Sequence, residues 1–358
     1  MHRQRPLMML ACVLAVSLAI TGCSMKKAPG PKSIVLAAID KISSANSYEF
    51  SKTIQFNELS TNIVLSNQME ESKWIFSFLN KSQVHISGIY QKSPHRIEMT
   101  IEFITGDEIP KSILMPVLVT EDKTYIQIAD LPDLNIPPET IGKYVEIDRS
   151  KSPLNKAHKD TEDGMQRRSL AQFNEEPFFK KTFKNANMSS PDNDMQQAYT
   201  FSVTEDNLDQ LIKVFVKEVV PVMLDLISDK TKVGYILGDK SIDDLEKRLR
   251  EVQQRDIQSW LDGVRKSFNL NNLQITSTID KDGFLRSEES IANLAYLNGN
   301  DFFKLDMIYS ERYSKMNEPA QFRMEEPANI IHKNELDALL QNFKHEIEPK
   351  QYDQHWIH

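Results

Sequence analysis

Hydrophobic and polar residues recur along the chain with two different periods. From Ile34 to Ile42 apolar residues return every three or four positions, which predicts an amphipathic helix. From Tyr48 to Phe56 apolar residues take every second position, and this period predicts a strand with one buried and one polar face. The change falls in residues 43–47, whose Ser and Asn side chains compete with helical hydrogen bonds. The folded part therefore begins with a helix that leads into a sheet.

Strand-like segments return several times, and in the first run of strands their connections are short. They cover residues 84–90, 97–103, 114–119, 125–128, 144–147, 199–203, 273–279, 284–296 and 305–313. Lys281-Asp282-Gly283 is typical of a hairpin turn. Parallel pairing requires crossover helices, which the first run of strands lacks, so we expect an antiparallel sheet and an α+β fold.

Two long amphipathic helices interrupt the strands. The first begins near Asn207 and carries a broad apolar stripe, in which Pro221 should kink or split the helix. The second begins near Ser241 and continues to Val264. A sheet with a continuous apolar face must be covered, so we expect these helices to cover it. Between the two groups of strands, residues 149–198 form a polar insertion, in which 176–179 predict one short helix and the rest a loop.

The N-terminus carries a targeting pattern. A basic start precedes an almost wholly apolar run from Leu7 to Ile20, a length typical of a secretory signal rather than of a membrane span. The run ends at Ile20-Thr21-Gly22-Cys23, which resembles the lipobox of bacterial lipoproteins. The resemblance implies that Cys23 becomes the first mature residue and carries a thioether-linked diacylglycerol. The alternative is an ordinary secretory signal with an incidental cysteine.

These patterns divide the chain into four parts. We expect a signal peptide over 1–22, a flexible tether over 23–32, a single domain over 33–347 that contains the insertion, and a C-terminal tail over 348–358. Two acyl chains suffice for durable anchoring, so the predicted location is the extracytoplasmic face of a bacterial cell membrane.

Composition narrows the function classes. The 358 residues carry a formal net charge of −8, which argues against nucleic acid as a partner. The two cysteines are Cys12, inside the predicted signal, and Cys23. No thiol of the mature chain is then free for a disulfide, a metal or nucleophilic catalysis.

The order of elements resembles the lipoprotein-carrier superfamily, which includes the periplasmic lipoprotein chaperone, its outer-membrane receptor and related Gram-positive lipoproteins. The resemblance is carried by residues 38–42 with 47–50, by Gly142-Lys143-Tyr144-Val145-Glu146-Ile147-Asp148 and by the hairpin 276–283. It implies a curved antiparallel half-open β-barrel with amphipathic helices covering its concave face. In that superfamily the space between sheet and helices often accepts acyl chains.

Eight apolar residues are candidates to line such a space, four on predicted strands and four on the first long helix. They are Phe50, Ile54, Met99, Phe103, Leu211, Phe215, Val219 and Met223. If the helices cover the sheet completely, these residues form a core. If the cover is loose, they line a lipid cavity, for which adaptable Met and Phe side chains are well suited.

Motifs of enzymatic chemistry are missing from the sequence. It contains no zinc-protease His-Glu-x-x-His, no glycine-rich phosphate loop and no nucleophile elbow, so we expect a non-enzymatic protein without cofactor or metal. The tail histidines His345, His355 and His358 lack defined ligand spacing. The acidic pairs Asp243-Asp244 and Glu288-Glu289 are typical of solvated surfaces.

Three functions fit these expectations. The first is an anchored lipoprotein that binds a hydrophobic ligand, either a lipid or the acyl part of a lipoprotein. The second is an interaction or sensor module with a filled half-barrel that docks another envelope protein or a second copy of itself. The third is a solute-binding lipoprotein of an ABC transporter, although such proteins normally build parallel sheets with many glycine turns.

Overall fold

A computed structural model describes residues 29–62, 76–130, 136–148, 167–182, 197–228, 239–254 and 256–332, with 335, 336 and 339. The predicted signal peptide, Cys23 and the C-terminal tail with its three histidines lie outside the described residues. The predicted tether ends earlier than expected, because the first helix begins at Pro31. Proline is well tolerated in a first helical turn, where its missing N–H has no intrahelical partner.

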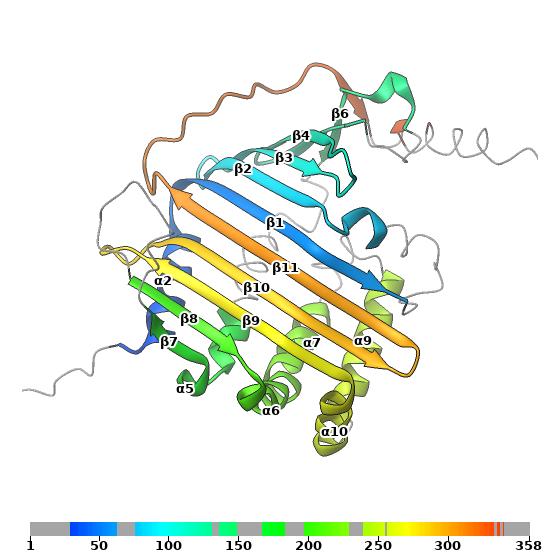
Figure 1. Cartoon of the computed structure of the whole chain (residues 1–358). Coiled ribbons are helices and arrows are strands. Elements are labelled where there is room, and N and C mark those ends of the chain that lie inside the picture. The colour runs from blue at the N-terminus through cyan, green and yellow to red at the C-terminus, as the bar shows by residue number, and fades with distance from the viewer. Residues whose placement is uncertain are drawn as a thin grey trace, which may run out of the picture.

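The described strands form one sheet (Figure 1). They are β1 (Ser47–Thr61), β2 (Gln83–Gln91), β3 (Arg96–Ile104), β4 (Ser112–Val119), β5 (Lys123–Gln127), β6 (Tyr144–Asp148), β7 (Phe179–Thr182), β8 (Gln197–Val203), β9 (Phe268–Ile279), β10 (Leu285–Asn298), β11 (Asp301–Ser314) and β12 (Ile330–His332). Their order is β12-β6-β5-β4-β3-β2-β1-β11-β10-β9-β8-β7. Neighbours are antiparallel, except that β12 runs parallel to β6. The antiparallel prediction is confirmed, and the sheet is open because β12 and β7 are its two edges.

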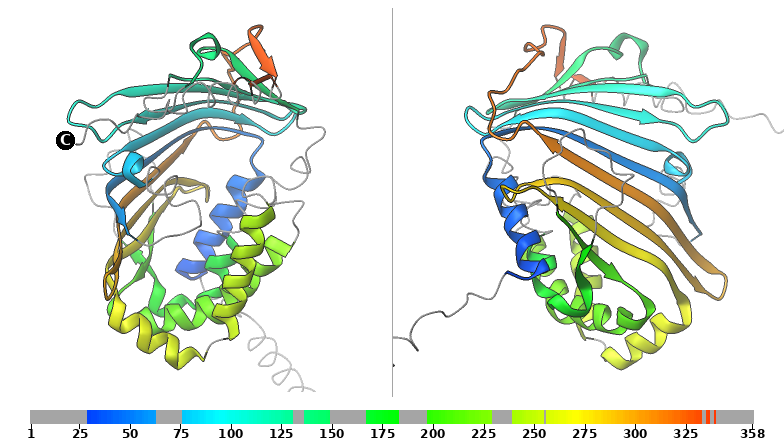
Figure 2. Two further views of the ribbon diagram at one scale, coloured as in Figure 1. Left: turned by 90° about the vertical axis from the view of Figure 1, so that its right-hand side faces the viewer. Right: turned by 60° about the vertical axis from the view of Figure 1, so that its left-hand side comes forward.

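The described helices are fewer than the strands. They are α2 (Pro31–Ser44), η1 (Pro138–Thr140), α5 (Glu175–Phe178), α6 (Glu205–Val214), the π-helix η2 (Phe215–Val219), α7 (Val220–Ser228), α9 (Asp239–Gln254) and α10 (Ile257–Ser267). The α+β class is therefore confirmed. The sheet is visibly curved (Figure 2).

The first long helix is not split at Pro221 but changes its winding there. Proline has no N–H to donate to the preceding turn, so the ladder is already interrupted at this position. The chain accommodates the loss with a π-turn, in which the Val220 N–H bonds to the Phe215 carbonyl. A π-turn contains one extra residue and rotates the side chains that follow.

The second long helix is in fact two helices. α9 begins at Asp239, two residues before the predicted start at Ser241, and α10 follows after a break. The Asp256 carboxylate caps α10 by accepting the Ser259 N–H at 2.9 Å. An Asp at this position satisfies one of the orphan donors of a helix start, which explains why a new helix begins here.

The main core lies between the helices and one half of the sheet. Val35, Ala38, Ile39 and Ile42 of α2 join one cluster with residues of β7–β10 and α6. The substantial contacts between helices and strands are those of α2, α5, α6 and α10 with strands β7 to β10. We call the sheet face that packs against this cluster, through Ile275, Leu294, Tyr48 and Tyr313, the inner face.

The predicted polar insertion contributes to this core. Its described part, residues 167–182, contains a helical turn at 167–172, α5 and β7, and β7 pairs with β8. The short helix expected at 176–179 is confirmed as α5, whereas the expectation of a loop is wrong for residues 167–172 and 179–182; residues 149–166 and 183–196 lie outside the described part of the chain. Phe173, Phe178, Phe179 and Phe201 form a group of ring contacts with centroids 5.1 to 5.5 Å apart. Their burial outweighs the polar composition of the surrounding sequence.

A C-terminal segment, residues 315–329, runs from the end of β11 to the start of β12, across the outer face of the sheet (Figure 1). We call it the strap. Near its start the Asn317 N–H bonds to the Ser47 carbonyl at 2.8 Å. Over β3 the Glu98 carboxylate accepts the backbone N–H groups of Arg323 and Met324, each at 2.8 Å. The strap then delivers β12 to the edge strand β6.

Candidate functional site

The structure brings the four strand candidates together on the inner face. Strand register aligns Phe50 with Gly88 and Gly88 with Met99. Four residues further along β1 it aligns Ile54 with Val84 and Val84 with Phe103. Alternation along each strand then places all four candidate side chains on the same face as Tyr48. Phe50, Ile54 and Met99 are half-buried, whereas Phe103 is buried.

Gly88 of β2 lies between Phe50 of β1 and Met99 of β3, whose side chains occupy the space that a side chain at position 88 would need. A Cβ atom built on it would lie 2.8 Å from Cζ of Phe50, 2.7 Å from Cβ of Met99 and 2.4 Å from the Glu98 carbonyl oxygen. The Phe50 ring therefore lies over the glycine, and a side chain at position 88 would displace it. The sequence analysis did not single out this glycine.

One end of this apolar surface is filled by an aromatic pair. The Phe78 ring stacks on Phe103, with centroids 4.3 Å apart and planes 8° from parallel. Phe103 thus behaves as a core residue. The open part of the surface is the part that contains Phe50, Ile54 and Met99.

The four helix candidates lie elsewhere and serve different roles. Val219 is buried, and Leu211 and Met223 pack against the main core cluster, of which the four strand candidates are not members. Phe215 is 40% exposed, whereas its neighbour Val216 is buried in the main core cluster. Among the described residues, the eight candidates therefore form two separate sets rather than one lining.

A row of polar side chains crosses the inner face beside the strand candidates. Lys52 of β1 pairs in register with Glu311 of β11, Glu311 with Glu288 of β10, and Glu288 with Ser277 of β9. We call these four residues the polar row. Glu311 is 6% exposed and Glu288 is 3% exposed, whereas the Lys52 side chain keeps 35% of its surface exposed. The expectation that Glu288 belongs to a solvated acidic pair is wrong.

The polar row is held by hydrogen bonds. The Lys52 ammonium lies 3.4 Å from Oε2 of Glu311, and the Tyr309 hydroxyl donates to the same carboxylate. The Ser277 hydroxyl donates to Oε2 of Glu288 at 3.2 Å. Burial, together with the Glu311 charge and a hydrogen bond to it, raises the pKa of Tyr313 above its ordinary value, so this phenol keeps its proton. The four residues become neighbours only through the pairing of β1, β11, β10 and β9, which cannot be deduced from any local sequence pattern.

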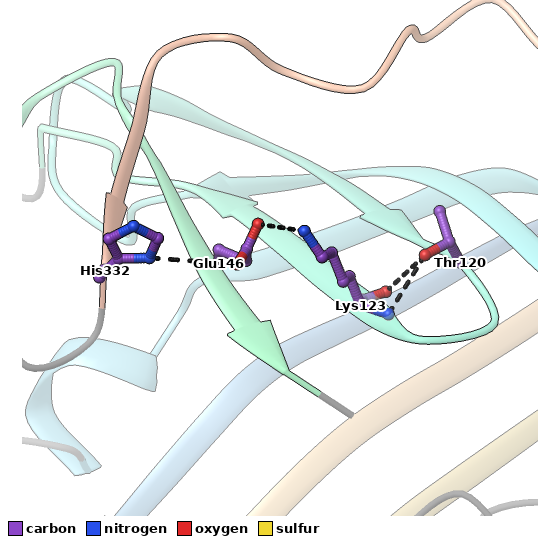
Figure 3. A network of polar contacts seen from close by, with 4 residues as sticks. All are labelled: Thr120, Lys123, Glu146 and His332. Carbon is purple, nitrogen blue, oxygen red and sulfur yellow. Dashed lines mark hydrogen bonds and ion pairs between the residues drawn. The ribbon is translucent and has the colours of Figure 1, made fainter. Parts of the chain in front are cut away.

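A second polar network lies on the outer face, at the β12 edge (Figure 3). The Lys123 ammonium lies 2.9 Å from Oε2 of Glu146, and Nδ1 of His332 lies 4.0 Å from the other oxygen. The hydrogen bond to Glu146 is the main cause that raises the pKa of Lys123. Thr120 closes the β4–β5 turn by accepting the Lys123 N–H at 3.2 Å. This network joins β5, β6 and β12 and stabilises the end of the strap.

Two features are absent from the described part of the chain. Within the described residues, no group of three or more His, Cys, Asp or Glu side chains is arranged to hold a metal ion. Across the same residues, no helix is long and apolar enough to cross a membrane. Asp243, of the other acidic pair, is exposed on α9.

Comparison with known proteins identifies no relative. No protein-family model matches the chain, and no curated protein does. Among solved structures, a porin-like protein from Bacteroides uniformis aligns over 76% of this chain and 96% of its own, with 10% identity and a TM-score of 0.18. A score this low carries no argument about fold or function.

Proposed function

We propose that the protein is a non-enzymatic, extracytoplasmic lipoprotein, anchored through Cys23, that binds the acyl part of a hydrophobic ligand on the inner face of its sheet. In this proposal the sheet is a half-open barrel of the lipoprotein-carrier type, with the helices covering its concave side. The ligand would occupy the part of the inner face formed by β1, β2 and β3.

One observation carries this proposal. Phe50, Ile54 and Met99 form an apolar surface that remains half-buried, while the substantial helix contacts are made with β7 to β10. Large apolar side chains gain about 1.5–3 kcal/mol each when they become fully buried. An alkyl chain laid over this surface would supply that burial. Flexible Met and Phe side chains adapt to chains of different shape.

The first experiment asks whether such a ligand exists. Protein extracted mildly from the producing membranes is analysed by native mass spectrometry, and binding of a fluorescent fatty-acyl probe is titrated after exchange into amphipol. We expect a lipid adduct or saturable probe binding above that of amphipol alone. Absence of both would refute the proposal and favour the filled interaction module, for which the Phe78–Phe103 stack is the supporting observation.

A chain-length series makes the test quantitative. Each methylene that becomes buried contributes about 0.8 kcal/mol, so affinity should increase roughly fourfold per added CH₂ until the surface is covered. The matched variants are Met99→Ser on the inner face and Thr100→Ser, one residue along the same strand on the other face. Only Met99→Ser should weaken binding. Equal effects would place the acyl chain elsewhere.

The anchor has an independent test. Cells that produce the chain are labelled with an alkyne-bearing fatty acid, and incorporation into the protein is compared with that of Cys23→Ser. We expect the label to be lost completely in Cys23→Ser. Equal labelling of both chains would show that Cys23 is not the acylated residue.

A further inference from the structure

The polar row lies at the boundary between two parts of the inner face. On one side its register continues through Ile86 of β2 and Ile101 of β3, within the apolar surface that contains Phe50 and Met99. On the other side it reaches Ser277 of β9, in the half of the sheet against which the helices pack. An acyl chain on β1–β3 would therefore end with its head group at Lys52.

The charges in this row are costly if they serve only the fold. Removing carboxylates and an ammonium from water carries a desolvation penalty that mutual attraction often fails to offset. Glu288 and Glu311 also face each other directly across neighbouring strands, where like charges destabilise a sheet. Hydrophobic residues at these positions would continue the apolar surface at less cost. This arrangement indicates a role in recognition.

Lys52 is the member of the polar row that is best placed to donate hydrogen bonds to a ligand. The Glu311 carboxylate already accepts from Tyr309 and pairs with Lys52, and Glu288 accepts from Ser277. An ammonium has three N–H donors, and Lys52 is the most exposed member of the row. The ligand atom that fits beside it is therefore an oxygen that accepts a hydrogen bond.

The charge that surrounds Lys52 determines whether this ligand oxygen is charged or uncharged. The row contains two carboxyl groups for one ammonium, so its field does not favour another anion. Resting on the proposed function above, we propose that the polar row binds the uncharged glyceryl-ester head of an acylglycerol, with the Lys52 ammonium donating to an ester or hydroxyl oxygen. The carboxylate of a free fatty acid is then a poorer ligand than the corresponding glyceride.

The test is a competition experiment on the full chain. Mono-oleoyl glycerol, oleate and a synthetic diacylglyceryl-cysteine peptide each displace an uncharged polyene probe that has no head group. We expect both glyceryl esters to compete at least tenfold better than oleate. The difference between the two esters tells whether the natural source is a free glyceride or the acylated N-terminus of another lipoprotein. Equal competition by oleate and mono-oleoyl glycerol would overturn the proposal.

The sheet offers a matched pair of variants. Lys304 of β11 pairs with Glu58 of β1 at 3.5 Å, which repeats the Lys52–Glu311 pair between the same two strands on the opposite face. Lys52→Met should weaken mono-oleoyl glycerol binding about tenfold or more, the effect of one charge-assisted hydrogen bond, and leave the probe unaffected. Lys304→Met should change neither. An identical response of both variants would contradict the assignment.

Two more variants keep the result interpretable. If Lys52→Met unfolds because Glu311 loses its partner, the double variant Lys52→Met/Glu311→Gln removes both charges and should show the same selective loss. Glu288→Gln removes one negative charge and should strengthen oleate binding. Unchanged oleate binding would refute the charge argument. If the wild-type chain fails to bind the probe itself, the proposed function fails rather than the head-group assignment.

Discussion

The strap can be released by removing one carboxylate. Glu98 is 7% exposed and accepts the backbone N–H groups of Arg323 and Met324, each at 2.8 Å. Glu98→Ala leaves these two donors without their acceptor in a partly buried position. Hydrogen bonds to a charged group are each worth about 1.5–3 kcal/mol, and entering water recovers part of the loss. We therefore expect the free energy of local strap opening to fall by about 2 to 4 kcal/mol.

Native-state hydrogen exchange measures this change directly. One factor of ten corresponds to about 1.4 kcal/mol, so the strap amides should exchange roughly 30- to 900-fold faster in Glu98→Ala. Strands β9 to β11 should retain their protection because the strap opens locally. The matched control is Glu102→Ala, on the same strand and face, whose carboxylate accepts from the Ser112 hydroxyl of β4 rather than from the strap. Unchanged strap exchange in Glu98→Ala, or equal acceleration throughout the sheet, would refute the reasoning.

Two further predictions concern the inner face. Gly88→Val places a side chain within 2.8 Å of Phe50. It should lower the free energy of unfolding, measured by denaturant titration, by about 1–3 kcal/mol. The control is Gly263→Ala, whose new Cβ meets no neighbouring element within 4 Å and which should be neutral or stabilising. Tyr313 has a raised pKa, so the folded state keeps a proton that the unfolded state loses above pH 10.0. The unfolding temperature should therefore fall as the pH rises above that value. It should fall less steeply for Tyr313→Phe than for the wild-type chain, and equal pH dependence of the two unfolding temperatures would contradict the burial of this phenol.

Local periodicity sufficed to predict most of the elements. Sequence patterns predicted β1 to β6 and β8 to β11: most of these strands alternate between polar and apolar residues, and β4 is a short apolar run before a turn. The antiparallel arrangement followed from the short connections between them. The helix α2 and the helical regions of α6 to α7 and of α9 to α10 followed from their apolar stripes, but the break between α9 and α10 did not.

Features that depend on distant partners escaped prediction. β7 has four residues, and only its pairing with β8 makes it a strand. Phe215 is exposed although it lies beside an apolar stripe, and only the packing of Val216 against the core separates the two residues. The contact of Glu98 with Met324 joins residues 226 positions apart.

The candidate site divides in the same way. Phe50, Ile54, Met99 and Phe103 could be chosen from sequence because each lies on the apolar side of its own strand. Their grouping with the polar row could not, because it depends on register between strands that are separated by more than 200 residues. Glu288 is identical in type to its neighbour Glu289, and only the pleat of β10 buries one of them.

The most direct test of the account locates the bound acyl chain. A photoreactive diazirine acylglycerol is bound to the full chain and irradiated, and the cross-linked peptides are identified by mass spectrometry. We predict saturable cross-links on inner-face residues of β1 and β3, with Phe50 and Met99 foremost, and competition by mono-oleoyl glycerol. Cross-links confined to the outer face, or labelling that an excess of unlabelled acylglycerol fails to reduce, would contradict the account.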